Sequence, residues 1–261
     1  NVNCVKVDGK HIYPLDPGEV IVTIKWNGLQ RKVHLDITYG LDWTGGSNSS
    51  FDGGEGTAED PYLIHNADQL NAAMHCNTTN KYYRLASDIF FNTHLLQEDG
   101  MPRSDARAWE PCDFKGHLDG NGKTIYGLYV SKQTTAVDQG FGLFANLYGT
   151  VKDLAVVDSH VEVGIENMFS GFTAGLICGR MKEGSSVSNC LVHGNVLAVN
   201  TRGGVCGEAE KNTSITDCFA CAHVSWTNWP DERWRPALGA GIVYDAKGTL
   251  ERCLSVGRVE N

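Results

Sequence analysis

The sequence has no run of about 18 consecutive apolar residues, the minimum for a helix that crosses a bilayer. It is also poor in basic residues, because 22 Lys and Arg stand against 31 Asp and Glu and give a formal net charge of −9. Nucleic acids and anionic membrane surfaces bind basic patches. The composition therefore argues against a membrane-spanning segment and against nucleic acid as a partner.

Familiar catalytic and metal-binding motifs are missing as well. The chain has no His-Glu-x-x-His motif, no Gly-rich phosphate loop ending in Lys-Ser/Thr and no Gly-x-Ser-x-Gly turn. The pair Cys218-x-x-Cys221 lies within a strand-like pattern rather than at a helix N-terminus, which disfavours a redox or zinc role. We predict no catalytic residues, no metal site and no cofactor.

What the sequence does contain is an apolar pattern that recurs five times, in which one apolar residue is followed by others three and five positions later. The five triplets are Ile125/Leu128/Val130, Val151/Leu154/Val156, Val187/Cys190/Val192, Ile215/Cys218/Ala220 and Leu250/Cys253/Ser255. Gly-rich apolar steps precede four of them, at 142–146, 175–179, 203–207 and 241–245. Recurrence every 26 to 36 residues indicates one structural unit stacked on itself.

The spacing within the triplets indicates which unit this is. The first apolar residue lies across a bend from a short strand, and the bend positions are Gly127, Asp153, Asn189, Asp217 and Arg252. Gly, Asn and Asp tolerate turn conformations, so all but Arg252 suit a corner. Short strands separated by corners are typical of a parallel β-solenoid. We predict about five coils over residues 80–261.

The same repeat predicts which side chains fill the interior. One inward column should hold Ile125, Val151, Val187, Ile215 and Leu250. Of the nine Cys, Cys190, Cys218 and Cys253 share one inward slot of successive coils, and Cys178 and Cys206 share another. Free Cys is among the most buried residue types. We therefore expect mostly reduced, buried thiols rather than a disulfide framework.

The N-terminal part of the chain follows a different pattern. Residues 1–42 alternate apolar and polar positions around Asn27-Gly28, which predicts a small antiparallel β module, Ig-like or partial. Residues 43–56 are rich in turn formers and predict a linker. Residues 57–261 then form the solenoid, with a helix over 66–76 that is N-capped by Asn66 and covers its open end. The chain begins without Met or a signal peptide, so we expect a piece of a longer, processed protein with further domains.

Three segments carry a family resemblance: FDGGEGTAEDPYLIHNADQL (51–70), YYRLASDIFF (82–91) and WEPCDFKGHLDGNGKTIYGLYV (109–130). They resemble the opening of bacterial cell-surface proteins that carry the GLUG repeat, and the similarity extends over about 51–261. The resemblance implies a right-handed parallel β-helix akin to pectate-lyase-like and adhesin folds, in a large secreted or surface-anchored protein. It carries over no catalytic residue.

Since β-helices also host polysaccharide lyases and hydrolases, the acidic residues are candidates for catalysis. Asp113, Asp119, Asp153, Asp158 and Asp217 are available, and Asp153 and Asp217 could lie on one ladder. Both occupy corners, where Asp bonds nearby backbone, so we expect structural roles. His160, His193 and His223 follow strand segments, and we expect them to face outward on the surface.

One insertion, at 225–239, interrupts the repeat. It holds three of the six Trp together with two Arg, which supply flat apolar faces and planar donors suited to sugar rings or a peptide. The candidate ligand-binding residues are Trp226, Trp229, Arg233, Trp234 and Arg235. Packing of these Trp against the solenoid is the alternative.

From these observations we predict a non-enzymatic, secreted or surface-exposed bacterial β-helix for adhesion or for binding a glycan or host surface ligand. A polysaccharide lyase or glycoside hydrolase on the same scaffold is the alternative. A groove with paired carboxylates or basic residues and perturbed pKa values would favour the enzyme.

Overall fold

The structure is a computed structural model, and it describes residues 5–8, 11–14, 18–26, 29–37, 42–76, 78–134, 139–165, 172–198, 201–226 and 239–260. The chain forms two compact units, Asn1–Leu41 and Asp42–Asn261. In the first unit, β1 (Val5–Asp8) pairs antiparallel with β2 (His11–Pro14), and β3 (Gly18–Trp26) pairs antiparallel with β4 (Leu29–Ile37). The predicted antiparallel pairing on either side of residues 27 and 28 is therefore confirmed.

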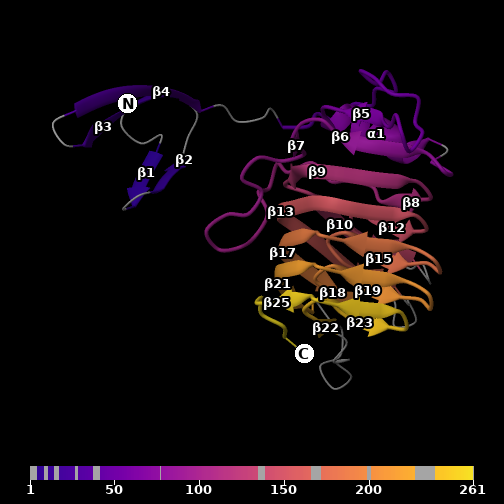
Figure 1. The fold of residues 1–261 in the computed structure, drawn as a ribbon. Helices are drawn as coiled ribbons and strands as arrows, with labels where there is room; N and C mark the ends of the chain where they lie inside the picture. Colours follow the sequence, from indigo (N-terminus) through magenta and orange to yellow (C-terminus); the bar gives the residue numbers. More distant parts are fainter. Residues whose placement is uncertain are drawn as a thin grey trace. The chain divides into compact units, whose positions relative to one another are not determined.

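The second unit begins with a cap. It consists of β5 (Tyr62–Ile64), α1 (Ala67–His75), β6 (Tyr82–Leu85) and β7 (Ile89–Phe90). The Asn66 side chain accepts a hydrogen bond from the Gln69 backbone N–H, which caps the helix N-terminus as predicted. Figure 1 shows α1 over one end of the stacked strands. Leu70, Ala73 and Met74 bury the apolar face of this helix in the core.

Below the cap, parallel strands stack into a β-solenoid of roughly four turns, since one wall has four strands. That wall consists of β11 (Gln139–Phe141), β14 (Phe172–Ala174), β18 (Thr201–Gly203) and β22 (Gly239–Ala240). A second wall consists of β8 (Cys112–Phe114), β12 (Phe144–Leu147), β15 (Cys178–Met181), β19 (Cys206–Ala209) and β23 (Val243–Ala246).

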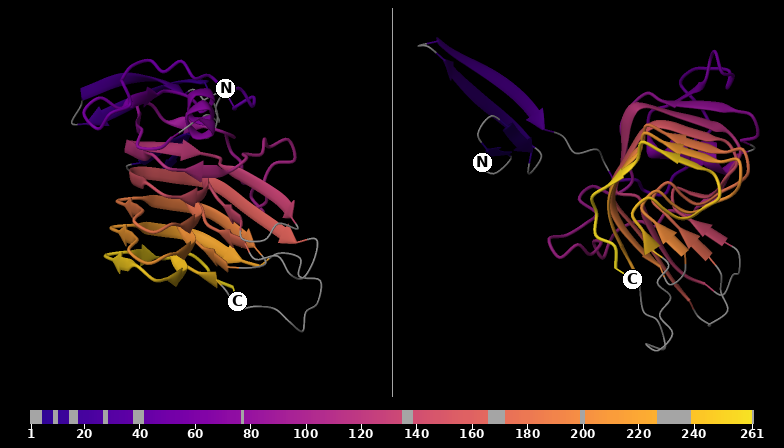
Figure 2. Two further views of the ribbon diagram at one scale, coloured as in Figure 1. Left: turned by 90° about the vertical axis from the view of Figure 1, so that its right-hand side faces the viewer. Right: turned by 60° about the horizontal axis from the view of Figure 1, so that its bottom comes forward.

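The third wall, here called the long wall, is a 12-stranded sheet that also includes the strands of the cap. Its other strands are β9 (His117–Tyr126), β10 (Tyr129–Thr134), β13 (Thr150–Ile165), β16 (Ser186–Ser188), β17 (Leu191–Ala198), β20 (Ser214–Thr216), β21 (Phe219–Ser225), β24 (Thr249–Glu251) and β25 (Leu254–Ser255). Figure 2 shows that successive coils enclose a common interior. The predicted all-β parallel solenoid with one helix is confirmed.

The predicted inward column is correct for three of its five residues. Val151, Val187 and Ile215 pair in register and are buried, but the residue next to Val151 in the column is Leu118. Ile125 belongs to a neighbouring column, where it pairs with Val156. The reason is that β9 carries two extra residues at its corner, because Asp119 pairs with Lys152 whereas Lys123 pairs with Leu154.

Leu250 keeps its register beside Ile215 but is 45% exposed. It lies in the last described coil, so no described strand covers its other side. Cys253 of the same coil is partly buried for the same reason, whereas Cys190 and Cys218 are buried as predicted. Cys178 and Cys206 also pair in register within the core.

At the corner of the long wall, successive coils place residues with a left-handed backbone conformation one above another. Asp153, Asn189, Asp217 and Arg252 have φ values of 54°, 49°, 55° and 51°. Gly127 was predicted at this corner and has φ 68°, but it lies at a second corner. The residue before it, Tyr126, pairs with Val157, so Gly127 corresponds to Asp158, which has φ 49°. The corner occupied by Asp153 is matched in β9 by Asn121 and Gly122, with φ values of 52° and 69°.

Candidate functional site

Strand register arranges the outer face of the long wall as columns of side chains. Two outward columns flank the inward column of Leu118, Val151, Val187 and Ile215. One contains Tyr82, His117, Thr150, Ser186, Ser214 and Thr249, and the other contains Arg84, Asp119, Lys152, Ser188, Thr216 and Glu251. Aromatic and charged groups therefore gather near the cap, and short hydroxyl side chains follow them.

A pocket of about 170 Å³ lies at the cap end of these columns, and we call it the platform pocket. Its aromatic wall is formed by Tyr82 and His117, whose rings stack with centroids 4.3 Å apart and an interplanar angle of 21°. His117 Nδ1 lies 2.9 Å from Thr150 Oγ1. Burial lowers the pKa of His117, so the imidazole is neutral at neutral pH. The platform is therefore an uncharged aromatic surface.

The polar part of the platform pocket's lining is an ion-pair network centred on Asp119, two residues along the same strands. Its Oδ2 accepts from Arg84 Nη2 at 3.1 Å and from Lys152 Nζ at 3.2 Å, and Lys152 Nζ also lies 3.4 Å from Asp153 Oδ2. Partial burial alone would raise the pKa of Asp119, but the Asn121 backbone N–H, Lys152 and Arg84 outweigh burial and lower it. The carboxylate is held ionised, with donors arranged around it.

A second hollow of about 300 Å³ runs along the corner column, and we call it the corner groove. On one side, Asn189 Nδ2 donates to Asp153 Oδ1 at 2.7 Å, and Asp217 follows one coil later. On the other side, Ala155, Leu191 and Phe219 pair in register as an outward apolar stripe, and Leu191 is exposed. The groove thus combines a polar wall with an apolar wall.

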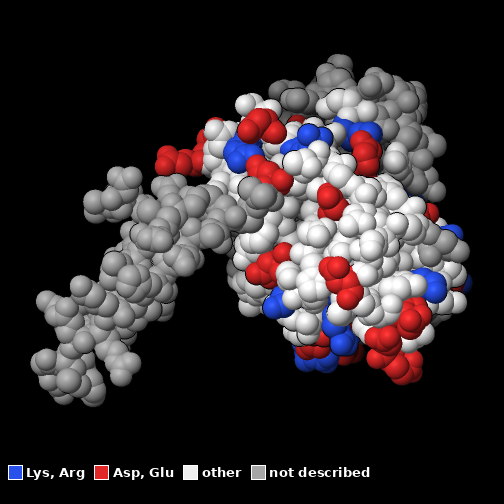
Figure 3. Space-filling model, turned by 90° about the horizontal axis from the view of Figure 1, so that it is seen from above, with Lys and Arg blue, Asp and Glu red and all other residues white. Residues whose placement is uncertain are grey.

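Seen from above, acidic and basic side chains are scattered among uncharged ones over the described part of this face, with several acidic side chains together at one edge (Figure 3). Within the site, the cations and carboxylates contact one another, as Arg84, Asp119 and Lys152 do. The charged groups of the site are therefore paired with one another.

The sequence-predicted carboxylate candidates are largely engaged in structural contacts. Asp153 and Asp217 lie on one corner ladder, as predicted, with Asn189 between them. Two strand spacings therefore separate their backbones, a distance of about 9.6 Å. A hydrogen bond from Arg252 lowers the pKa of Asp217, so this carboxyl is not poised as a proton donor. Asp113 accepts a hydrogen bond from Asn146 Nδ2 at 2.7 Å.

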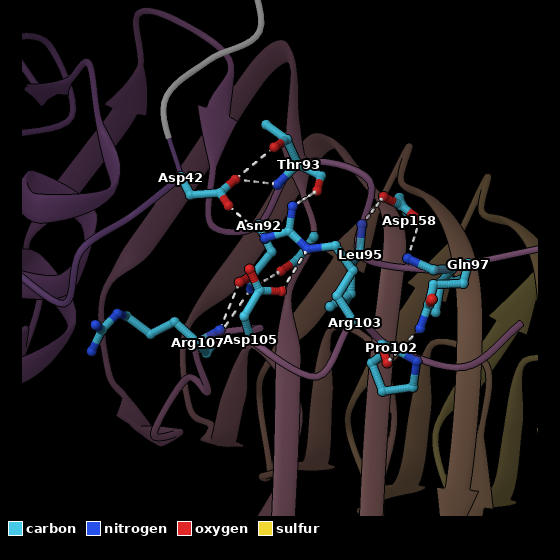
Figure 4. Close-up of polar contacts among 12 residues, drawn as sticks. Asp42, Asn92, Thr93, Leu95, Gln97, Pro102, Arg103, Asp105, Arg107 and Asp158 are labelled. Carbon is cyan, nitrogen blue, oxygen red and sulfur yellow. Dashed lines mark hydrogen bonds and ion pairs between the residues drawn. The ribbon is translucent and has the colours of Figure 1, made fainter. Parts of the chain in front are cut away.

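Asp158 belongs to a separate polar cluster (Figure 4). Its carboxylate accepts the backbone N–H groups of Leu95 and Leu96 at 2.7 and 3.1 Å, and burial raises its pKa. Nearby, Asp42 accepts from Arg103 Nη2 at 2.6 Å and from the Thr93 backbone N–H at 2.6 Å. These contacts attach the loop at 92–109 to the body of the unit, which is a structural role.

Of the predicted Trp-rich site, only Trp226 is described, and it is half-buried directly after β21. Trp229, Arg233, Trp234 and Arg235 lie outside the described residues. The structure therefore does not place these five candidates together, and their role stays a prediction.

The expectation that His160 faces solvent is wrong, because its side chain is fully buried. Its Nδ1 lies 3.4 Å from Asn195 Nδ2, which also donates to the Gly100 carbonyl at 2.7 Å. The loop at 92–109 thus covers the strand position that periodicity places outside. His193 is exposed and His223 is partly exposed, as expected.

Sequence reasoning did not identify the platform pocket. A signal was present in the segments Tyr82-Tyr83-Arg84, His117-Leu118-Asp119 and Thr150-Val151-Lys152, each of which places a buried apolar residue between two outward polar or aromatic ones. Aligning them requires the correct register at the corner of β9. In the part of the chain that the structure describes, no three His, Cys, Asp or Glu side chains could hold a metal ion.

No family model matches the chain. Over 121 residues, 44% of the chain, it is 31% identical to a protein of Evansella cellulosilytica named "Putative Gly-rich membrane protein". Over 115 residues, 41% of the chain, it is 35% identical to halomucin of Haloquadratum walsbyi. The matched stretches make up 13% and 1% of these relatives, so the chain spans a small part of their length.

Among solved structures, the chain matches the crystal structure of a "putative immunoglobulin A1 protease from Bacteroides ovatus". The match has a TM-score of 0.43 and 15% identity and covers 80% of each chain. No helix among the described residues is long and apolar enough to cross a membrane. The resemblance to GLUG-repeat proteins stays a prediction.

Proposed function

We propose that this β-solenoid is a secreted or surface-exposed, non-catalytic module that binds carbohydrate through the outer face of its long wall and so mediates adhesion. The observation that carries the proposal is the platform pocket, where the stacked rings of Tyr82 and His117 lie beside the network of Arg84, Asp119 and Lys152. Sugars present apolar ring faces and hydroxyl groups, and this pocket offers a partner for each.

Two physical features support a sugar ligand. Tyr82 and His117 cover one face of each other, which fixes both rings, so little conformational entropy is lost when a sugar packs against their remaining apolar surface. The carboxylate of Asp119 and the cations of Arg84 and Lys152 are fixed by their mutual contacts and can donate to or accept from ligand hydroxyls without large rearrangement. Binding sites of this kind combine a few fixed polar groups with an apolar surface.

The names of the sequence relatives support the location. One is named a Gly-rich membrane protein and the other a halomucin, and both are much longer than the matched stretch. A solenoid within a long surface protein would present its long wall to ligands outside the cell. The insertion at 225–239 remains a second proposed contact, through Trp226, Trp229, Arg233, Trp234 and Arg235.

Of the alternative enzymes, a polysaccharide hydrolase has less support than a binding module. A glycosidase needs one carboxyl group that is protonated in the ground state. The pKa values of Asp119 and Asp217 are both lowered, by hydrogen bonds that outweigh burial for Asp119 and by the bond from Arg252 for Asp217. Among the described residues, the carboxyl of Asp158 has a raised pKa, and it is occupied by two backbone N–H groups.

Retention on immobilised polysaccharides and mucin tests the proposal. We expect Tyr82→Ala to reduce binding at least tenfold, because a platform ring supplies about 1.4 kcal/mol or more of the binding free energy. Tyr244→Ala is the matched control, since Tyr244 is an exposed Tyr on β23 of another wall. Equal binding by both variants and the wild type would overturn the platform as the site, and release of reducing ends or unsaturated products would establish the enzyme instead.

A further inference from the structure

The platform pocket and the corner groove share a boundary. Lys152 lines the platform pocket and Asp153 lines the corner groove, and their charged groups lie 3.4 Å apart. The two residues are consecutive in β13, so the two hollows meet along this strand. The two hollows are therefore neighbours, with the Lys152–Asp153 ion pair at their border, and the corner groove extends farther toward the C-terminal coils.

The surface of the two hollows runs along the stacking direction of the strands. The register Arg84, Asp119, Lys152, Ser188, Thr216 crosses five successive strands of the long wall. Four steps between strands of about 4.8 Å each give a length of roughly 19 Å. Figure 1 shows the strands of this wall, from β9 through β21, lying one above another.

The middle of the surface is formed by short polar side chains. Ser186, Ser188, Ser214 and Thr216 are half-buried and point outward with one hydroxyl each, at positions repeated from coil to coil. Short hydroxyl side chains leave room for a ligand and can both donate and accept hydrogen bonds. Across the corner column from Ser188 and Thr216, Leu191 and Phe219 of the same two coils form an apolar wall, while Tyr82 and His117 supply aromatic rings near the cap.

The charged groups along this surface are paired with one another. The cations are Arg84, Lys152 and Arg252, and the carboxylates are Asp119, Asp153, Asp217 and Glu251, which lies 3.1 Å from Arg252. Each cation lies within ion-pair distance of at least one of these carboxylates, and their formal charges sum to −1. A charged ligand would have to break these pairs, whereas an uncharged hydroxylated ligand would not.

From these observations we infer that the platform pocket and the corner groove are two ends of one track for a linear, uncharged polysaccharide that lies along the solenoid axis. The inference rests on the proposed function and adds the ligand's charge, shape and direction. A repeating polymer suits a surface whose own hydrogen-bonding groups repeat at each coil. Acidic polysaccharides are disfavoured by the net charge of −9 and by the paired ions of the track.

Calorimetry with neutral disaccharides and octasaccharides of gluco-, manno- and galacto-series tests the track, with oligogalacturonate as the acidic probe. We expect octasaccharides of one neutral series to bind at least tenfold more tightly than the disaccharide, because only they reach both ends. Phe219→Ala should remove most of this gain and leave disaccharide binding unchanged. Ser188→Arg, which places a long side chain in the middle of the track, should act in the same way.

The outcomes separate the track from the platform. Equal affinity for short and long oligosaccharides, abolished by Tyr82→Ala but not by Phe219→Ala, would overturn the track and retain the proposed function. Preference for oligogalacturonate would overturn the assignment of an uncharged ligand. Loss of all binding and of the melting transition in Phe219→Ala would point to misfolding of that variant, and Ser188→Arg, at a half-exposed position, then decides the question. Binding of no saccharide by folded wild-type protein would overturn both proposals.

Discussion

Arg252 lies one coil below Asp217 on the corner of the long wall and donates two hydrogen bonds to it, from Nε to Oδ1 at 2.6 Å and from Nη2 to Oδ2 at 2.8 Å. This contact accounts for an Arg with φ of 51°, a conformation that L residues other than Asn and Asp rarely adopt. The pair thus offsets backbone strain at the one corner whose residue type does not suit a left-handed turn.

The first prediction separates the strain from the pair. Arg252→Ala removes the hydrogen bonds and keeps the strain, whereas Arg252→Gly removes both. We expect the Gly variant to melt a few degrees above the Ala variant, because the left-handed conformation costs a non-Gly residue about 1 kcal/mol or more. Thermal unfolding followed by circular dichroism measures the difference. A lower melting temperature for Gly would show that the corner is not strained.

The second prediction concerns the inward column. Ile215→Ala should lower the free energy of unfolding by about 2 to 5 kcal/mol, because it leaves a cavity in a close-packed core. Leu250→Ala, at the next position of the same column, should cost less than about 1 kcal/mol, because that side chain is 45% exposed. Denaturant unfolding of the two variants provides the comparison. Equal losses would mean that Leu250 is covered in the folded protein.

These two variants also illustrate what the sequence could predict. The repeat of apolar residues predicted the solenoid, its parallel strands and the column from Val151 to Ile215, because burial imposes the same spacing in every coil. It misplaced Ile125, because β9 contains two extra corner residues, Asn121 and Gly122, that lengthen the first repeat. A triplet around Gly127 fits the same spacing by coincidence, because a second corner, at Gly127 and Asp158, follows the first one along the chain.

The candidate site could be predicted only in part for the same reason. Asp153 and Asp217 share a column because their triplets align, but the platform pocket depends on the register of β6 and β9, which the misplaced triplet obscured. His160 was expected to face solvent. Periodicity correctly places its side chain on the outer side of the strand, but the loop at 92–109, distant in sequence, covers it there. Such covering contacts leave no periodic signal.

The third prediction is a pH dependence. The pKa of Asp119 in the folded protein is lowered below 3.8, so its contribution to stability is present above that pH and is lost as pH falls through the folded value. Asp119→Asn should therefore flatten the dependence of the melting temperature on pH below about 4, and it should destabilise the protein at neutral pH. An unchanged acid limb in this variant would show that the contacts of Asp119 with Arg84 and Lys152 do not persist in solution.

The fourth prediction concerns the thiols. Burial raises the pKa of Cys178 well above that of a free thiol, and Cys190 is also buried with a raised pKa, so neither should react with a disulfide reagent in the folded protein. Among the described cysteines Cys76 is exposed and should react first. In denaturant without reductant we expect at least five of the nine Cys to titrate as free thiols. Two or fewer would indicate a disulfide framework.

The last prediction tests the Trp-rich insertion against its alternative of simple packing. If Trp229 and Trp234 contact a ligand, Trp229→Ala and Trp234→Ala should leave the melting temperature nearly unchanged and abolish retention on a glycan or mucin array. If they pack against the solenoid, each substitution should instead cost about 3 to 5 kcal/mol of stability, which lowers the melting temperature markedly. Tyr244→Ala again serves as the control on a different wall.

Comparing these variants with Tyr82→Ala on the same array tells whether the insertion and the platform bind one ligand or two, because variants that lose the same glycans contact the same molecule. Loss of stability without loss of binding would remove the insertion from the list of contacts and leave the platform as the proposed site.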